Sequence, residues 1–197
     1  MRTGRYRLES DEVIIKVFKQ EYRVVTEANA FQIYPGQIEA DREITFLVGV
    51  FVARWSLAEF ALMLAFLVAI QSQRQETATA ALAATSSAEA KIQLVLKTLE
   101  AAPAREHRRE PIRNAVKKLL KLCEERNALM HHLWGRRSTG EIMTINYRQP
   151  DPTKSQTVRT AESLKALCNS LVDIAHGIAA ATGSTWLSAE EAEHLKV

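Results

Sequence analysis

Apolar residues recur at helical spacing over most of the chain. The longest such stretch covers residues 39–71, and two shorter ones cover 88–101 and 111–133. A last stretch begins after Thr160, a good N-cap residue, and stops near Gly183, a residue type common just after helices. Its apolar positions are Leu164, Leu167, Leu171, Ile174 and Ile178. The pattern therefore predicts about four main helices.

The spacing changes to alternation between residues 141 and 159. Met143 and Ile145 alternate with polar neighbours, and Pro150-Asp151-Pro152 separates this run from residues 156–159. Alternation followed by a turn-forming segment predicts a β-hairpin, inserted before the last helix. We therefore expect an all-α protein, a helical bundle with a small hairpin at about residues 141–159.

Two segments fit more than one interpretation. Residues 11–25 have apolar positions at helical spacing, but Val13-Ile14-Ile15 fits a strand equally well. Residues 76–87 are rich in Ala, Thr and Ser and fit either a frayed helix or a linker. Because Pro35-Gly36 breaks the chain, we divide it into an N-terminal extension of uncertain structure, residues 1–34, and a bundle domain, residues 35–197.

Residues 46–70 are long and apolar enough to span a bilayer. However, Arg54 and Glu59 would lie near the middle of such a span, at a cost of roughly 2.5 to 3.5 kcal/mol each. We therefore predict a buried central helix, with a membrane span as the alternative. Glu59 also interrupts an apolar stripe on this helix. The stripe consists of Val48, Val52, Trp55, Met63 and Phe66.

Composition narrows the class of protein. A chain of 197 residues with 47% hydrophobic and 25% charged residues suits one globular domain. The two cysteines, Cys123 and Cys168, fall on apolar helix faces, which suits core thiols in a reducing compartment. Acidic residues follow the basic N-terminus where a signal peptide needs an apolar segment. We therefore predict a cytoplasmic protein; the net charge of +3 adds little.

The helix over residues 111–133 carries an unusual polar group beside its apolar face. On a helical wheel, Arg126 and Asn127 flank that face, His131 follows Asn127 by one turn, and His132 lies on the solvent side. The face itself consists of Ile112, Val116, Leu119, Cys123, Met130 and Trp134. Since a buried carboxylate needs a partner, we expect Glu59 to pair with Arg126; a simple ion pair at the helix rim is the alternative.

These residue types suit phosphodiester chemistry. Arg126 could bind a phosphate, His131 could transfer a proton near neutral pH, and Asn127 could position the substrate. In RNA the 2′-hydroxyl supplies the nucleophile, so no metal is required. We therefore predict Arg126, His131 and Asn127 as catalytic residues supported by Glu59.

Basic residues near this group could guide RNA. Arg113 and Lys117 lie on the same wheel edge as His131, and Arg136 and Arg137 follow the helix. A solvated helix face explains them equally well. The neighbouring histidines point about 100° apart and lack a metal-binding spacing, so we predict no metal and no cofactor.

The segment Arg126-Asn127-Ala128-Leu129-Met130-His131 resembles the R-x4-6-H motif of the HEPN superfamily. The resemblance covers residues 39–183; residues 1–34 and the hairpin are not part of the family's core pattern. It implies a homodimer that joins two motifs in one cleft, a metal-independent endoribonuclease, and a toxin or defence effector with an antitoxin or regulatory protein as partner. Because the family includes non-catalytic members, the alternative is a helical module that binds a nucleotide or a protein.

Overall fold

A computed structural model describes residues 12–17, 20–25, 31–33, 41–71, 74–101, 106–137, 140–146, 148–149 and 156–197. The chain divides into two compact units, which we call the sheet unit and the helical unit. The sheet unit comprises Met1–Val48 and Asn127–Leu164, and the helical unit comprises Gly49–Arg126 and Lys165–Val197. Each unit is described by itself below.

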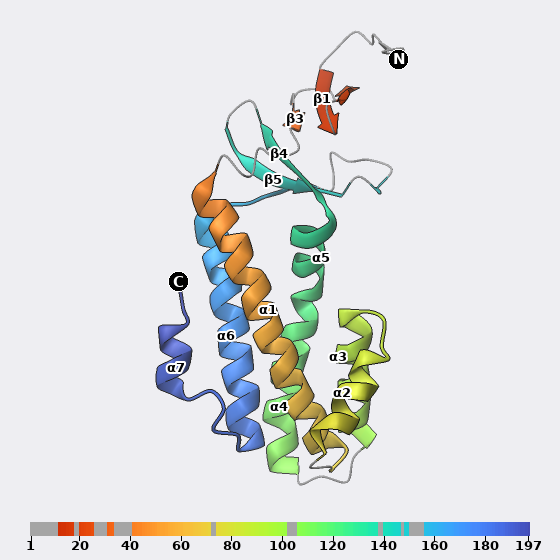
Figure 1. Cartoon of the computed structure of the whole chain (residues 1–197), viewed down its shortest axis with the longest axis vertical. Coiled ribbons are helices and arrows are strands. Elements are labelled where there is room, and N and C mark those ends of the chain that lie inside the picture. The colour runs from red at the N-terminus through yellow and green to blue at the C-terminus, as the bar shows by residue number, and fades with distance from the viewer. Residues whose placement is uncertain are drawn as a thin grey trace. The chain divides into compact units, whose positions relative to one another are not determined.

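The described part of the chain is mostly helical, as predicted (Figure 1). The helices are α1 (Arg42–Ala69), α2 (Gln75–Ala83), α3 (Ala88–Ala101), α4 (Glu106–Lys121), α5 (Cys123–His131), α6 (Ala161–Thr182) and α7 (Ala189–His194). The strands are β1 (Glu12–Val17), β2 (Gln20–Val25), β3 (Phe31–Ile33), β4 (Leu133–Arg137), β5 (Ile142–Ile145) and β6 (Gln156–Val158).

In the helical unit, α1 contacts several other elements. Glu59 of α1 lies near Lys91 of α3, and Met63 accepts a hydrogen bond from Thr79 of α2. The ring of Phe60 packs on Trp186, which follows α6, with 4.6 Å between centroids. The core of this unit includes Phe51, Leu62, Ile92, Leu99, Ile112, Val116, Leu119, Leu171 and Ile178. Burial of these apolar side chains is the main force that holds the helices together.

Helix α1 is the one helix among the described residues that is long and apolar enough to cross a membrane, by length and composition only. A core helix passes the same test, and many side chains of α1 are buried. The predicted apolar stripe is only partly buried, however, because Val52 is 40% exposed. Val52 therefore lies at the surface of the described part of the chain.

The helix boundaries agree well with the pattern in two places. Helix α3 covers the predicted residues, and the hydroxyl of Ser87 accepts a hydrogen bond from the amide of Ala90 at its start. Helix α6 begins after Thr160, whose hydroxyl accepts from the amide of Ser163. Both hydroxyls satisfy amide groups that a helix N-terminus leaves unpaired.

The predicted helix over residues 111–133 is wrong in its extent. Helix α4 begins earlier, at Glu106, and the chain turns at Leu122 before α5 begins. The amide of Leu122 bonds to the carbonyl of Leu119, three residues back, which is a tighter turn than an α-helix makes. Residues 133–137 form β4 instead of a helix end.

Other differences concern segments with short or mixed patterns. The Ala-rich segment forms the helix α2, and α7, a helix that we did not predict, begins at Ser188 with a capping box. Within residues 11–25 the chain forms β1 and β2, so the strand alternative holds there.

The sheet unit is built on strands in the order β2-β1-β3-β4-β5-β6. The predicted hairpin is confirmed, because β5 and β6 pair antiparallel. The sheet extends further than the hairpin: β4 also pairs with β5, and β3 joins β4 to β1. Apart from the parallel pair β1–β3, the pairs are antiparallel.

The C-terminus of α6 ends in a Schellman motif. The amide of Ser184 bonds to the carbonyl of Ala179, and that of Gly183 to the carbonyl of Ala180. Gly183 has a φ of +75°, which places it in the left-handed region where a Cβ is unfavourable. The sequence position of this glycine therefore marks the true end of the helix.

Two glycine substitutions in and after α6 should change stability in opposite directions. Gly183→Ala should lower the free energy of unfolding by about 1 kcal/mol, because of its left-handed backbone. Gly177 lies inside the helix, where an added Cβ meets no atom within 4 Å. Gly177→Ala should therefore raise the free energy of unfolding by up to about 1 kcal/mol. Urea denaturation measures both; a Gly183→Ala variant as stable as wild type would contradict this helix end.

Candidate functional site

Helix α5 carries the three predicted catalytic residues. Arg126 is half-buried and belongs to the helical unit, whereas Asn127 and His131 are exposed and belong to the sheet unit. Asn127 and His131 are one turn apart and share a helix face. Arg126 and His131 are five positions apart and therefore point about 140° away from each other. The structure thus places Asn127 and His131 together on an exposed face in the sheet unit, whereas Arg126 belongs to the helical unit.

The predicted apolar face is confirmed in α4 and at Cys123, the first residue of α5, but is wrong at Met130. Ile112, Leu119 and Cys123 are buried, but Met130 is 43% exposed. Ala128 and Leu129 are buried in its place. The wheel assumed one uninterrupted helix, whereas the chain turns at Leu122 and enters a strand after His132. Asn127, which was expected beside the buried face, is therefore exposed.

Trp134 lies on β4 and not in a helix. Its indole N–H donates to the carbonyl of Leu129 at 3.1 Å. This bond fastens the start of β4 to α5 within the sheet unit. It also gives a donor to one of the last carbonyls of α5, which a helix end leaves without a partner inside the helix.

Glu59 has a neighbour that we did not expect. Its Oε1 lies 3.8 Å from the Nζ of Lys91, and the side chain is 39% exposed. Glu59 and Arg126 both affect the pKa of the Cys123 thiol, so both charges lie near that sulfur. An ion pair between Glu59 and Arg126 stays a prediction, but Glu59 is half-exposed and already has a cation beside it.

Glu59→Gln should therefore have a small effect on stability. An exposed ion pair contributes roughly 0 to 1 kcal/mol, so we expect a loss in that range in urea denaturation. Glu100→Gln on α3, an exposed position, is the matched control. A loss of about 3 kcal/mol or more for Glu59→Gln alone would instead indicate a buried pair.

The two cysteines are buried and unpaired thiols, as predicted. Burial, together with the carboxylates of Glu89 and Glu59, raises the pKa of Cys123 to about 11, although Arg126 opposes this shift. Burial also raises the pKa of Cys168. Neither thiol is poised to act as a nucleophile.

Both thiols should resist Ellman's reagent at pH 8 in the folded protein. With a pKa of about 11, only about a thousandth of Cys123 is thiolate at that pH. Both cysteines should react once the chain is unfolded in guanidinium. Rapid reaction of a thiol in the native protein would contradict the burial of that residue.

His132 is the site residue that the sequence interpretation missed. It is half-buried, whereas we expected it on the solvent side and His131 nearer the core. Burial lowers the pKa of His132, and the positive charges of Arg159, His131 and Arg148 lower it further. His132 is therefore neutral at pH 7. Nothing in the apolar pattern indicated that α5 ends at His131. The helical wheel was therefore continued past the end of the helix, and it placed His132 wrongly.

The four residues expected to bind RNA are divided between the two units, and their role in binding RNA stays a prediction. Arg113 pairs with Glu110 at 2.6 Å and Lys117 is exposed, both in the helical unit. In the sheet unit, Arg136 lies 3.9 Å from Asp41. The side chain of Arg137 lies outside the described residues. The edge that Arg113 and Lys117 were expected to share with His131 assumed an uninterrupted helix, whereas the chain turns at Leu122.

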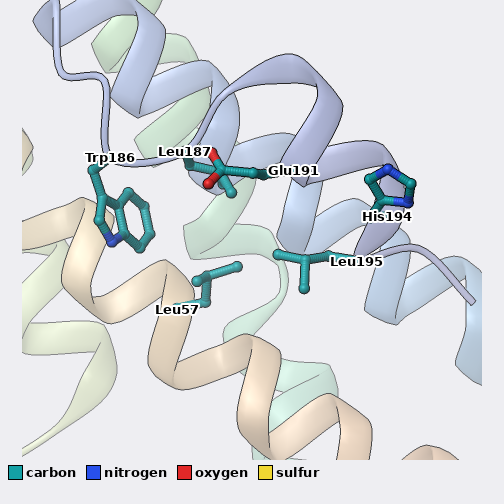
Figure 2. Close-up of a pocket in the computed structure, with 6 residues that line it drawn as sticks. All are labelled: Leu57, Trp186, Leu187, Glu191, His194 and Leu195. Atoms are coloured by element: carbon teal, nitrogen blue, oxygen red, sulfur yellow. The ribbon is translucent and has the colours of Figure 1, made fainter.

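A shallow groove of about 340 Å³ lies in the helical unit (Figure 2). Leu57 of α1 forms one side, and residues of the C-terminal segment form the other. Its lining is mostly apolar and consists of Leu57, Trp186, Leu187, Glu191, His194 and Leu195. None of the motif residues lines it.

Within the described ranges, no three His, Cys, Asp or Glu side chains are grouped so that they could hold a metal ion. Comparison of the chain with protein-family models, with curated proteins and with solved structures finds no match. The function is therefore argued from the residues themselves.

Proposed function

We propose that this protein is a HEPN-type endoribonuclease that cleaves RNA without a metal ion. The observation that supports the proposal is the exposure of Asn127 and His131 on one face at the end of α5, directly after Arg126. An exposed imidazole can approach a phosphodiester, and an amide one turn away can hold a substrate oxygen. The surrounding chain is mostly helical, as the family resemblance implies.

The proposed reaction is a transesterification within the RNA strand. A base removes the proton of the 2′-hydroxyl, whose oxygen attacks the adjacent phosphorus. The bond from phosphorus to the 5′-oxygen breaks, and an acid protonates that oxygen. The products are a 2′,3′-cyclic phosphate and a 5′-hydroxyl. His131 serves as the base or the acid, and Arg126 stabilises the charge on the phosphorane.

The geometry of α5 favours a homodimeric site. Since Arg126 and His131 of one helix point about 140° apart, they cannot easily face one phosphate from the same side. In a dimer that joins two motifs, the arginine of one copy and the histidine of the other could do so. We extend the proposal to a cytoplasmic homodimer, acting as a toxin or defence effector under the control of an antitoxin or another regulatory protein.

Purified protein incubated with mixed RNA in excess EDTA tests the proposal. Wild type should cleave RNA, and His131→Ala should lose about 10²- to 10⁴-fold in rate because general acid–base catalysis is worth that much. Arg126→Ala should be similarly impaired. His194→Ala, which removes an exposed histidine of α7, should cleave at the wild-type rate.

Three results would contradict the proposed endoribonuclease activity. These are loss of cleavage in EDTA, a wild-type rate in His131→Ala, and an absence of cleavage by the wild-type dimer. The last result, together with binding of a nucleotide or a protein, would favour the non-catalytic helical module.

A further inference from the structure

Residues 186–197, which we call the strap, fold back along α6 and are fastened to it at both ends. The Nδ1 of His176 lies 3.1 Å from the carbonyl oxygen of Leu187. Asn169 donates from its side-chain amide to the carbonyl of Val197 at 3.1 Å and accepts from the amide of Val197 at 3.0 Å. The strap therefore runs antiparallel to α6.

The strap is also fastened to α1. A terminal guanidinium nitrogen of Arg54 donates to the carbonyl of Leu195 at 2.8 Å. The rings of Phe60 and Trp186 pack with 4.6 Å between their centroids. Because these contacts hold the strap in place, the groove between the strap and α1 is preformed. A partner that binds a preformed groove loses less free energy to ordering.

One side of the strap lines the groove opposite Leu57 of α1 (Figure 2). Glu191 and Leu195 are one helical turn apart, and Leu187 lies beside Glu191. Leu57, Leu195 and Trp186 are half-buried, so part of each apolar side chain stays accessible. The groove is shallow and, at about 340 Å³, near the lower limit of small-molecule sites. Its shape suits a few side chains of a protein partner.

The rim of the groove is acidic. The strap carries the three glutamates Glu190, Glu191 and Glu193 and one lysine, Lys196. The Nζ of Lys196 lies 3.0 Å from the carboxylate of Glu193 and 3.1 Å from that of Asp173, so its charge is balanced there. Glu190 and Glu191 are exposed, and Glu191 itself lines the groove. These two carboxylates leave negative charge beside the apolar lining.

This charge separates the candidate occupants of the groove. Two copies of the chain in a symmetric contact would bring the same carboxylates together, and like charges repel. RNA and an anionic membrane surface are negative and are repelled as well. A partner that combines positive charge with apolar side chains is attracted instead.

We propose that this groove binds a basic amphipathic helix of another protein. The apolar face of that helix packs against Leu57, Trp186 and Leu195, as in other helix-in-groove complexes. Its lysine and arginine side chains face Glu190 and Glu191. The inference goes beyond the proposed function and does not rest on it, because the groove is lined by none of the motif residues.

Fluorescence anisotropy of the full chain with two labelled peptides tests the proposal. Both peptides have about four helical turns and contain only leucine and lysine, in equal proportions. In the first peptide the leucines share one face of the helix, and in the second they are spread around it. Wild type should bind the first peptide at least fivefold more tightly than the second, because only the first presents an apolar face.

Two groove variants and two matched controls locate the binding site. Leu57→Ser should weaken binding of the first peptide at least fivefold, because it removes apolar contact. Glu191→Gln should weaken it about two- to fivefold, the worth of an exposed ion pair, and a glutamine keeps the capping box. Leu94→Ser and Glu100→Gln change a half-buried leucine and an exposed glutamate of α3 and should each alter binding less than twofold.

Four results would overturn the proposed groove. These are failure of wild type to bind the first peptide, equal binding of the two peptides, wild-type affinity in both groove variants, and losses as large in the controls. Self-association of wild type that Leu57→Ser abolishes would place a second copy in the groove and would overturn it too. Glu191→Gln changes an exposed residue, so it decides the question if Leu57→Ser lowers the melting temperature.

Discussion

The hydrogen bond between Arg159 and Thr144 fixes a permanent charge inside the sheet unit. Burying a guanidinium costs several kcal/mol unless it is well bonded, so the surroundings of such a residue are constrained. The bond ties the end of β6 to the middle of β5. The same charge lowers the pKa of His132, the residue that follows α5, so it lies near that histidine.

The end of α5 is thus a junction of a helix, a sheet and several positive charges. His131 remains exposed, while His132 is drawn partly into the unit and kept neutral at pH 7. The two adjacent histidines therefore differ in environment, since His131 is exposed and His132 is half-buried. Such a division suits a site that both binds a phosphate and transfers protons.

Much of the helical fold could be predicted because its cause is local. Apolar spacing predicted α3 correctly, and the capping residue Thr160 marked the start of α6. The turn at Leu122 and the strand β4 could not be predicted, because a tight turn and strand pairing depend on distant residues. Because this interruption was not predicted, Met130 was expected in the core but is exposed. For the same reason, His131 is more exposed than His132, the reverse of what was expected. No sequence pattern indicated that Arg159 is buried, because its burial depends on the register of the paired strands.

The most direct test of this account is the pKa of the His132 ring, measured by NMR in wild type and in two Arg159 variants. We expect a value below the ordinary 6.5 in wild type and in Arg159→Lys, which keeps the positive charge. In Arg159→Gln the pKa should rise toward 6.5, because one opposing charge is gone. A wild-type pKa at or above 6.5, or a folded Arg159→Gln variant with an unchanged pKa, would contradict the account.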